Sequence, residues 1–370
     1  MAKNVLIHTR SLNIPGGKQT YLLALEDYFK NDFSYFFYGT QQPVKESKLA
    51  FVKRFISDYI KFYRLLKKEE FDVVHINTSF NFKSYFRDSI FTLISKMLGN
   101  KTVVYWHGWN MDFEKKYADK IVPYFHFTFG KADVMVCLAN EFSDKLKAYR
   151  YKKPIYTETT VVADSIMKYS EYIDNADSKT FSGLGQNNIL FLSRVERVKG
   201  IYETIDSFQS LQNRHPNLTL TIAGTGGELE NAENYVKEKK LGGVAFLGWI
   251  EGDEKLKALR NCDIFVLATY HGEGMPIAVL EAMAMGKPVI TTDLGAIKDF
   301  FEDGKMGLKV KTRDSKDLEN KLEQLIAQPE LMKRMGSYNI LYAKERFSPE
   351  LVSERLENIY EDAMNEPTRS

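Results

Sequence analysis

The 370-residue chain is 44% hydrophobic and 27% charged, which is the balance of a globular protein, and it is long enough for two domains. Its two cysteines, Cys137 and Cys262, lie far apart in apolar runs, which excludes a disulfide framework, and no stretch approaches the roughly 20 apolar residues of a membrane span. The net charge of +2 divides into +8 over residues 1–165 and −6 over residues 166–370, so the two halves are expected to face different partners.

Short apolar runs alternate with helix-length amphipathic segments in the first half of the chain. Runs such as "NVLIHT", "FDVVHIN" and "KTVVYWHG" are largely apolar, as in strands that are buried on both faces. Strands that alternate with helices predict a parallel sheet covered on both sides. Residues 1–165 are therefore predicted to form one doubly wound α/β domain.

The alternation breaks over residues 166–186, which are rich in Ser, Asp, Asn and Lys and are predicted to be a linker. It restarts with "NILFLSRV" and "LTLTIAGTG", so residues 187–349 are predicted to form a second domain of the same kind. The tail, about 315–364, has apolar residues at helical spacing. Two such domains would present the carboxyl ends of their strands to a central cleft.

Paired glycines, Gly16 and Gly17, follow the first predicted strand, at the start of a helix that begins near Lys18. Glycines let a backbone approach a ligand closely, and a helix N-terminus favours negative charge. The pair is not the G-x-G-x-x-G of a dinucleotide site. It is compatible with an anion site and equally with a plain tight turn.

His107 ends the run "KTVVYWHG", where a strand is expected to reach the edge of the sheet. A histidine there could donate to a sugar hydroxyl or to a reacting oxygen, and a packed histidine is the alternative. No Cys, His or carboxylate stands near it at metal-ligand spacing, which argues against a zinc site. His8 and His75 lie inside strands and are predicted to be core or supporting residues.

The segment "FLSRVERVKG" places Arg194 after an apolar strand and Lys199 just before Gly200 and a helix. The guanidinium fork and the ammonium point charge suit a diphosphate group. The alternative is a solvated basic loop.

Two carboxylates, Glu273 and Glu281, occur in "HGEGMPIAVLEAMAMG". Pro276 fits the first turn of a helix, so Glu273 is expected in the preceding loop and Glu281 on the helix. The amides around the start of this helix would form an anion pocket, and they belong to Gly274, Met275 and Ile277. Two acids on either side of such a pocket make sense as acceptors for hydroxyl groups, one sugar on each side of a diphosphate. That arrangement describes a nucleotide sugar.

Residues 48–68 form a basic amphipathic segment with an apolar stripe and only one acid, Asp58. Residues 80–101 add further aromatic and basic side chains. A basic, aromatic helix of this kind is typical of binding to an anionic membrane surface, and a core helix with a solvated basic face is the alternative. Nucleic acid is not expected as a partner, because no nucleic-acid-binding module is visible.

Together these motifs resemble the family-4 retaining glycosyltransferases, or glycosyl transferases group 1, which have the GT-B fold of two Rossmann-like domains. The resemblance covers nearly all of the chain and is strongest from about 188 to 310. It is carried by the glycine pair, by Arg-x4-Lys-Gly, by "AGTGGE" and "FLGWI", and above all by E-x7-E in "EGMPIAVLEAMAMGKPVI".

The resemblance implies roles for matching positions. Glu273 would bind hydroxyls of the donor sugar, and Glu281 would bind the ribose of the nucleotide. Arg194 and Lys199 would neutralise the diphosphate, and His107 would lie near the donor sugar. The catalytic set would then be His107, Arg194, Lys199 and Glu273. The further donor-binding positions would be Gly16, Gly17, Gly248, Trp249, Gly274, Met275, Pro276, Ile277 and Glu281. The last helix, 350–370, would pack back on the N-terminal domain, which would bind the acceptor.

The expected reaction is retaining transfer of a hexosyl unit from a nucleotide-diphosphate sugar, with UDP favoured over GDP, to a glycan or lipid-linked glycan in cell-surface polysaccharide or glycoconjugate synthesis. The chain has no Asp-x-Asp, so no metal and no cofactor are expected. Lys18, Ser193, Gly295-Ala296 and Asp299 depart from the common pattern. The last two put contacts to the donor sugar in doubt, and Lys18 is a candidate contact for a charged acceptor.

Two other functions stay open on the sequence. One is a GT-B sugar-nucleotide epimerase, which would use no acceptor, and the other is a catalytically silent nucleotide-binding partner subunit. A dehydrogenase is disfavoured, because neither half has the dinucleotide glycine fingerprint. The N-terminus is too short in apolar residues for a signal peptide, so a cytoplasmic protein is expected, with peripheral attachment to the inner face of the cytoplasmic membrane.

Overall fold

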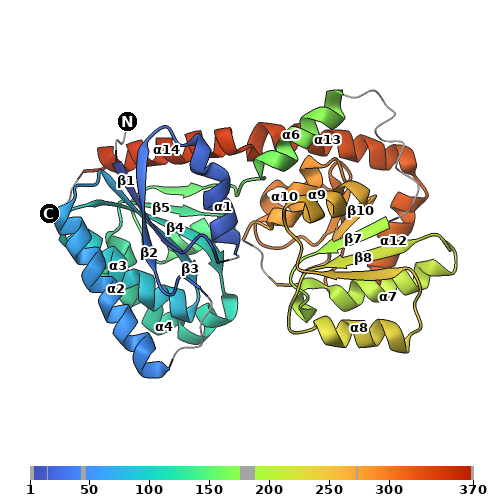
Figure 1. Cartoon of the computed structure of the whole chain (residues 1–370), viewed down its shortest axis with the longest axis horizontal. Helices are drawn as coiled ribbons and strands as arrows, with labels where there is room; N and C mark the ends of the chain where they lie inside the picture. The colour runs from blue at the N-terminus through green and yellow to red at the C-terminus, as the bar shows by residue number, and fades with distance from the viewer. Residues whose placement is uncertain (1–3, 15, 43–46, 176–187, 272–273, 368–370) are drawn as a thin grey trace. The chain divides into compact units, whose positions relative to one another are not determined.

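The computed structural model describes residues 4–14, 16–42, 47–175, 188–271 and 274–367. The chain divides into two compact units: unit 1 holds Met1–Val161 and Pro349–Ser370, and unit 2 holds Val162–Ser348. Each unit has a six-stranded sheet with helices packed against it (Figure 1). All strand pairs in both sheets are parallel, which confirms the predicted fold class of two Rossmann-like doubly wound α/β domains.

Unit 1 has its sheet in the order β2-β1-β3-β4-β5-β6. Its strands are β1 (Asn4–Arg10), β2 (Asp32–Tyr38), β3 (Val73–Phe80), β4 (Lys101–Trp109), β5 (Val134–Cys137) and β6 (Ile155–Thr157). Its helices are α1 (Gly17–Leu25), α2 (Lys48–Lys68), α3 (Phe82–Met97), α4 (Met111–Phe127), α5 (Asn140–Ala148) and α14 (Pro349–Asn365), with short 3₁₀ turns η1 (Glu26–Tyr28) and η2 (Phe129–Lys131).

The four central strands of unit 1, β1, β3, β4 and β5, are mostly buried because helices cover both faces of the sheet. All but one residue of β3 are buried, as the unbroken apolar run had indicated. On one face, α3 packs on β3 and β4, with α2 against α3; on the other face, α14 packs on the same two strands, with α1 against it. The free thiol of Cys137 is buried in β5, as predicted.

The helix α14 is bound to unit 1 by specific polar contacts. The Tyr360 hydroxyl lies 2.6 Å from His75 Nδ1, and Glu357 Oε1 accepts hydrogen bonds from the amides of Lys30 and Asn31 at 2.6 and 2.8 Å. Arg355 Nε donates to Glu158 Oε2 at 2.9 Å. The last helix of the chain is thus part of the first unit, where the sequence had placed it.

Unit 2 has its sheet in the order β12-β11-β10-β7-β8-β9. Its strands are β7 (Asn188–Leu192), β8 (Thr219–Ala223), β9 (Val244–Gly248), β10 (Ile264–Leu267), β11 (Val289–Thr291) and β12 (Gly307–Lys309). Its helices are α6 (Asp164–Asn175), α7 (Ile201–Gln212), α8 (Leu229–Glu238), α9 (Gly252–Asn261), α10 (Ile277–Ala284), α11 (Ile297–Phe300), α12 (Ser315–Ile326) and α13 (Pro329–Phe347), with the 3₁₀ turn η4 (Arg197–Lys199).

Two hydrophobic cores lie on the two faces of this sheet. One contains buried residues of α6, α9, α10 and the end of α13, including Cys262, and the other contains buried residues of α7, α8 and α12. The carboxyl ends of β7 and β10 are therefore held between two packed layers. A site built on the loops that follow them has a rigid support.

The predicted linker is wrong over its first part. Residues 164–175 form α6, whose Ile166 and Met167 are buried in a core of unit 2, because their apolar side chains recur at helical spacing. Residues 176–186 lie outside the described residues. The boundary between the units falls at Val161–Val162. No helix in the part of the chain that the structure describes is both long enough and apolar enough to cross a membrane.

Candidate active site

The candidate site of unit 2 lies where the strand order of its sheet reverses. The chain moves outward from β7 to β8 and β9 on one side and to β10, β11 and β12 on the other. Ligands of open parallel sheets bind at the carboxyl ends of the strands at such a switch point. The loops that follow β7 and β10 are the two that meet there.

These two loops are hydrogen-bonded to each other. The Tyr270 amide donates to the Val198 carbonyl at 2.9 Å, and Thr269 Oγ1 donates to the same carbonyl at 3.1 Å. Gly200 has φ +80°, and a Cβ there would lie 2.3 Å from the Ala268 carbonyl oxygen. Only glycine permits this close approach of the backbones, which explains the Gly of the "VKG" motif.

The loop after β7 carries both predicted cations. The side chain of Arg194 is exposed and has no hydrogen bond or ion pair among the described residues, whereas Lys199 is 6% exposed and is the last residue of η4. The neighbouring Arg197 is engaged elsewhere, 4.5 Å over the Tyr202 ring and 3.8 Å from Glu228 Oε2. The sequence motif therefore separates two cations at the switch point from a third that packs on α7 and the start of α8.

The helix α10 begins where the sequence had predicted. Pro276 is its N-cap and Ile277 its first residue, so the amides of Ile277 and Ala278 have no partner within the helix, whereas the Val279 amide donates to the Pro276 carbonyl at 3.0 Å. Gly274 and Met275 precede it, and Gly272 and the predicted catalytic residue Glu273 lie outside the described residues. The position of Glu273 toward any ligand stays a prediction.

Glu281 has a partner that sequence reasoning missed. Its Oε1 lies 2.5 Å from Nζ of Lys255, a residue of α9, and the carboxylate side chain is 2% exposed. Burial raises the pKa of Glu281, and the Lys255 ammonium opposes that rise. No spacing signal in "EGDEKLKALRN" indicates this pair, because it depends on how α9 packs beside α10.

Gly248 and Trp249, predicted to meet the nucleobase, lie at the end of β9. Gly248 has φ +66°, and its carbonyl accepts a hydrogen bond of 2.6 Å from the Gly224 amide, which ties the ends of β8 and β9 together. The Trp249 side chain is 53% exposed, and its Nε1 donates to Glu251 Oε2 at 3.2 Å. An exposed indole at the edge of the site is available for stacking.

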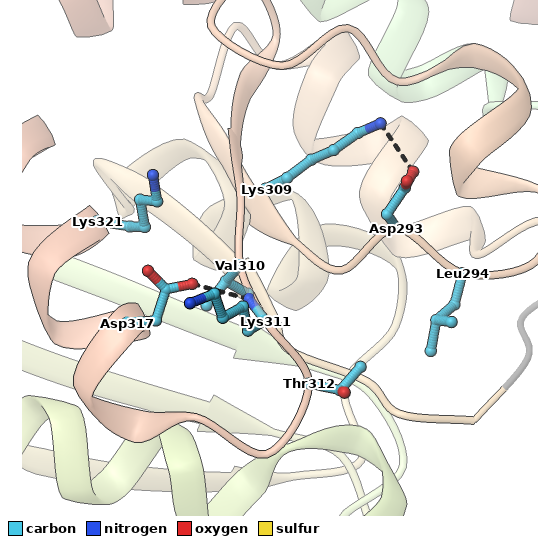
Figure 2. Close-up of a pocket in the computed structure, with 8 residues that line it drawn as sticks. All are labelled: Asp293, Leu294, Lys309, Val310, Lys311, Thr312, Asp317 and Lys321. Carbon is cyan, nitrogen blue, oxygen red and sulfur yellow. Dashed lines mark hydrogen bonds and ion pairs between the residues drawn. The ribbon is translucent and has the colours of Figure 1, made fainter.

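A pocket in unit 2 lies at the carboxyl ends of β11 and β12. Figure 2 shows the lysines and acids that line it. Lys309 Nζ pairs with Asp293 Oδ1 at 2.7 Å, and the backbone amide of Lys311 donates to Asp317 Oδ2 at 2.8 Å. Leu294, from the loop after β11, also lines it. Its two acids therefore already pair with a lysine and a backbone amide of the same pocket. Gly295, with φ +56°, Ala296 and the exposed Asp299 follow in the same loop and α11.

The glycine pair of unit 1 lies at the start of α1. Gly16 is the N-cap and Gly17 the first helical residue, and the Thr20 amide donates to the Gly16 carbonyl at 3.0 Å. Burial lowers the pKa of Lys18 to about 7, although the Asp88 carboxylate acts in the opposite direction. The strand order of unit 1 reverses between β1 and β3, so α1 starts at the switch point of this sheet.

His107 lies two residues before the end of β4, the strand that pairs with β3. Its ring stacks on Tyr105, with centroids 4.2 Å apart, and meets the edge of Tyr21 of α1 at 5.6 Å. Its Nε2 lies 2.6 Å from Oδ1 of Asn77 in β3. Burial, with smaller contributions from the charge of Lys18 and from His75, lowers the pKa of His107 well below its ordinary value. Asn77 was missed, although an amide inside the buried run "VVHIN" was a visible signal.

In each unit the structure brings some of the predicted residues near one another, while Glu273 lies outside the described residues. Unit 2 brings together the loop after β7, the start of α10 and the end of β9, and it adds Lys255. Unit 1 brings His107 near Lys18 and α1, and it adds Asn77. Within the described residues no group of three or more His, Cys, Asp or Glu side chains could hold a metal ion.

Comparison with known proteins gives this arrangement a family. Residues 173–341, a stretch of unit 2, match the family of glycosyl transferases group 1. A glycogen synthase of Mycobacterium tuberculosis is 29% identical over 151 residues, which cover 40% of this chain and 36% of that protein. The chain thus spans about a third of the length of this curated relative.

Two solved structures share the whole fold. Sucrose-phosphate synthase from Thermosynechococcus elongatus superposes with a TM-score of 0.74 at 15% identity over 98% of this chain and 99% of its own. Anabaena HepE in complex with UDP and glucose superposes with a TM-score of 0.70 at 14% identity over 97% and 99%. The fold and the two switch-point sites define a protein of the GT-B class. Within that class, residues 173–341 match the glycosyl transferases group 1, and the chain is similar to proteins of that family.

Proposed function

We propose that this protein transfers a hexosyl unit from a nucleotide-diphosphate sugar to a hydroxyl of a glycan or lipid-linked glycan, with retention of configuration. The observation that carries the proposal is the junction of the loop after β7 with the loop that leads into α10, through the Val198 carbonyl. This junction supports a diphosphate site to which Arg194, Lys199 and the amides at the start of α10 would contribute.

UDP is the favoured nucleotide. HepE, which shares the fold, binds UDP and glucose in its crystals, and this supports a UDP-hexose donor here. Glu281 would accept hydrogen bonds from the ribose hydroxyls, Glu273 from hydroxyls of the hexose, and the Gly248–Trp249 segment would face the base.

In the proposed reaction the bond between the anomeric carbon and the phosphate oxygen breaks, and a bond from that carbon to the acceptor oxygen forms on the same face. The acceptor hydroxyl gives its proton to the departing phosphate oxygen. Arg194, Lys199 and the helix-end amides stabilise the negative charge that grows on the leaving diphosphate. No metal is needed for this role, so we expect transfer to continue in the presence of a chelator. Loss of activity that manganese restores would contradict this expectation.

The test is sugar transfer by Arg194→Ala and Lys199→Ala, with Arg197→Ala as the matched control. Each of the first two changes is expected to lower kcat/KM at least about 100-fold, because transition-state charge stabilisation is removed. Arg197 is on the same loop but packs on Tyr202 and Glu228, so its removal should change kcat/KM by less than about threefold. Near-normal turnover in both test variants would overturn the assignment.

Two controls separate the proposal from its alternatives. Conversion of a nucleotide sugar to an isomer without any acceptor would reveal an epimerase. A thermal-shift screen that finds no stabilisation by UDP, GDP, ADP or dTDP or by their sugars would indicate a catalytically silent partner subunit, because a bound ligand raises the unfolding temperature.

The surface of α2 and α3 supports a membrane-bound acceptor. Large apolar side chains of α2 point to solvent, among them Leu49, Val52, Ile56 and Ile60, which are 65%, 51%, 54% and 45% exposed. Exposed apolar residues of α3 continue this surface: Phe82, Phe86, Ile90 and Met97. α2 and α3 pack side by side (Figure 1). The Tyr59 hydroxyl of α2 donates to the Arg87 carbonyl of α3 at 3.3 Å.

If α2 were a core helix with a solvated basic face, its whole apolar stripe would pack inward. Only part of the stripe does so, such as Leu66, which is 7% exposed. Exposed apolar residues flanked by lysines and arginines suit an anionic lipid surface. We therefore propose that the protein works in the cytoplasm, attached peripherally to the inner face of the membrane through residues 48–68 and 80–101. Such a location fits a lipid-linked glycan acceptor in cell-surface polysaccharide or glycoconjugate synthesis.

A further inference from the structure

Asn77 joins three strands at the carboxyl end of the unit 1 sheet. It lies in β3 with no exposed surface. Its Nδ2 donates to the His8 carbonyl of β1 at 3.2 Å, and its Oδ1 lies 2.6 Å from Nε2 of His107 in β4. A buried amide with both ends engaged has a single orientation.

That orientation decides where the proton of His107 resides. The His8 carbonyl oxygen accepts hydrogen bonds and cannot donate one, so the amide nitrogen must face it. The Oδ1 that is left to face His107 is likewise only an acceptor. Nε2 of His107 must therefore carry a hydrogen and donate it to Asn77.

The other ring nitrogen of His107 is then free to accept. Burial keeps the ring neutral, and the charge of Lys18 and the neighbouring His75 act in the same direction. With its one N–H proton on Nε2, the ring has a lone pair on Nδ1. Among the described residues Nδ1 has no hydrogen-bond partner, and the Tyr105 and Tyr21 rings hold the imidazole plane in place.

We propose that Asn77 is a positioning residue that fixes His107 as the neutral Nε2–H tautomer, so that Nδ1 serves as a hydrogen-bond acceptor for a sugar hydroxyl. His107 then accepts a hydrogen bond from its substrate through Nδ1 and does not donate one. This removes the donor role that the sequence had left open. The tautomer itself follows from the contacts of unit 1 alone, whereas the hydroxyl as its target rests on the proposed function.

The tautomer can be measured on the wild-type protein. Nitrogen-15 histidine labelling gives six ring systems, and loss of one signal set in His107→Gln identifies the ring of interest. Long-range proton–nitrogen spectra distinguish a protonated Nε2 from a protonated Nδ1. We expect a protonated Nε2 and a bare Nδ1 at neutral pH. A protonated Nδ1, alone or in an imidazolium ring, would overturn the proposal without bearing on whether the protein transfers sugar.

The substitution Asn77→Leu tests the positioning role, because it keeps the branched shape of the side chain and removes the acceptor. Thr78→Val is the matched control: Thr78 is the next residue of β3, is equally buried, and its hydroxyl has no partner among the described residues. We expect Asn77→Leu to shift the His107 signals toward the Nδ1–H tautomer and to lower kcat at least about tenfold, with a change in donor KM below about threefold. Thr78→Val should match the wild type in both measurements.

Two further outcomes are decisive. Wild-type kcat in a folded Asn77→Leu protein with a shifted tautomer would overturn the substrate half of the proposal. An unshifted tautomer in that variant would overturn the positioning half. If Asn77→Leu does not fold, the wild-type spectrum still decides the tautomer, and absence of transfer by the wild type refutes the proposed function instead.

Discussion

The carboxylate of Glu281 is almost completely buried in α10, a helix of the proposed nucleotide site. A buried carboxylate favours the neutral acid, and a nearby cation favours the charged form. The Lys255 ammonium, 2.5 Å away, favours the charged carboxylate. If Glu281 accepts hydrogen bonds from ribose hydroxyls, as proposed, Lys255 would support nucleotide binding without contacting the nucleotide.

Replacing Lys255 by methionine should make UDP binding dependent on pH. Without the ammonium the pKa of Glu281 rises further, so a growing fraction becomes the neutral acid as pH falls, and affinity for UDP falls with it. We expect the ratio of variant to wild-type Kd, measured by calorimetry, to increase at least about threefold between about pH 8 and about pH 6.

Lys257→Met is the control for this experiment, because Lys257 is an exposed residue of the same helix. The ratio to wild type cancels protonation of the ligand, which is common to all three proteins. A pH-independent ratio for Lys255→Met would show that Glu281 does not need its partner.

The sequence could identify site residues but not their partners. Arg194, Lys199 and Glu281 stand in motifs whose spacing is local, so they were visible in one chain. Lys255 and Glu281 are 26 residues apart, and Asn77 and His107 are 30 apart, with a helix or strand between the members of each pair. Such pairs depend on how helices and strands pack together, and that packing cannot be predicted from a pattern along the chain.

Among the helices, α2 shows what a periodic pattern predicts and what it leaves open. Its range, Lys48–Lys68, is the one read from the sequence, because the helical spacing of apolar residues is local. The pattern cannot say which side faces the core. The structure buries Phe62 and Leu66 and leaves Ile56 and Ile60 outward, because α3 and the sheet cover only the first pair.

The double substitution Ile56→Glu with Ile60→Glu should abolish attachment to anionic vesicles. It places two like charges on the face proposed to enter the lipid interface, and the side chains are already exposed, so the fold should tolerate it. Flotation with vesicles rich in anionic lipid, at low salt, is expected to recover at least about tenfold less variant than wild type.

The control for flotation is Leu341→Glu, which changes an apolar side chain of unit 2 that is 53% exposed. It should float like the wild type. Wild-type protein that fails to float, or a double variant that floats equally well, would refute the membrane surface and leave the transferase proposal intact.

At the scale of the whole molecule, alternation of strands and helices predicted two parallel α/β units, because each crossover repeats the same local pattern. It could not predict the strand orders, which differ between the units. It did place His8 and His75 inside strands as core or supporting residues, and the structure buries both in unit 1. Burial lowers the pKa of His8 and of His75 to about 3 in each case.

These histidines should make unit 1 sensitive to acid. Their unfolded pKa is near 6.5, so between about pH 6.5 and about pH 3 the unfolded chain binds more protons than the folded one, and stability falls as pH falls. Each histidine contributes a slope of about 1.4 kcal/mol per pH unit. His8 packs on Tyr38 and Phe91, so His8→Phe should preserve the packing and remove its share of the slope.

Tryptophan fluorescence in a Trp249→Phe background reports the unfolding of unit 1 alone, because the other two tryptophans, Trp106 and Trp109, are buried there. Urea unfolding at several pH values gives the slope. His126→Phe, at an exposed histidine of α4, is the control and should leave the slope unchanged. A slope in His8→Phe equal to that of the wild type would refute the role of His8, whose charged neighbours are Asp88, Arg87 and Lys18.

The attachment of α14 to unit 1 has a consequence for biosynthesis. Residues 1–161 emerge from the ribosome before α14 does, so unit 1 is incomplete at that stage. His75 then lacks its contact with Tyr360, and the Lys30 and Asn31 amides lack their acceptor, Glu357. Unit 2, being continuous from Val162 to Ser348, is complete before α14 emerges. The half that is translated first is therefore the half that is finished last, and a nascent chain stalled before Pro349 would carry an assembled unit 2 and an open unit 1.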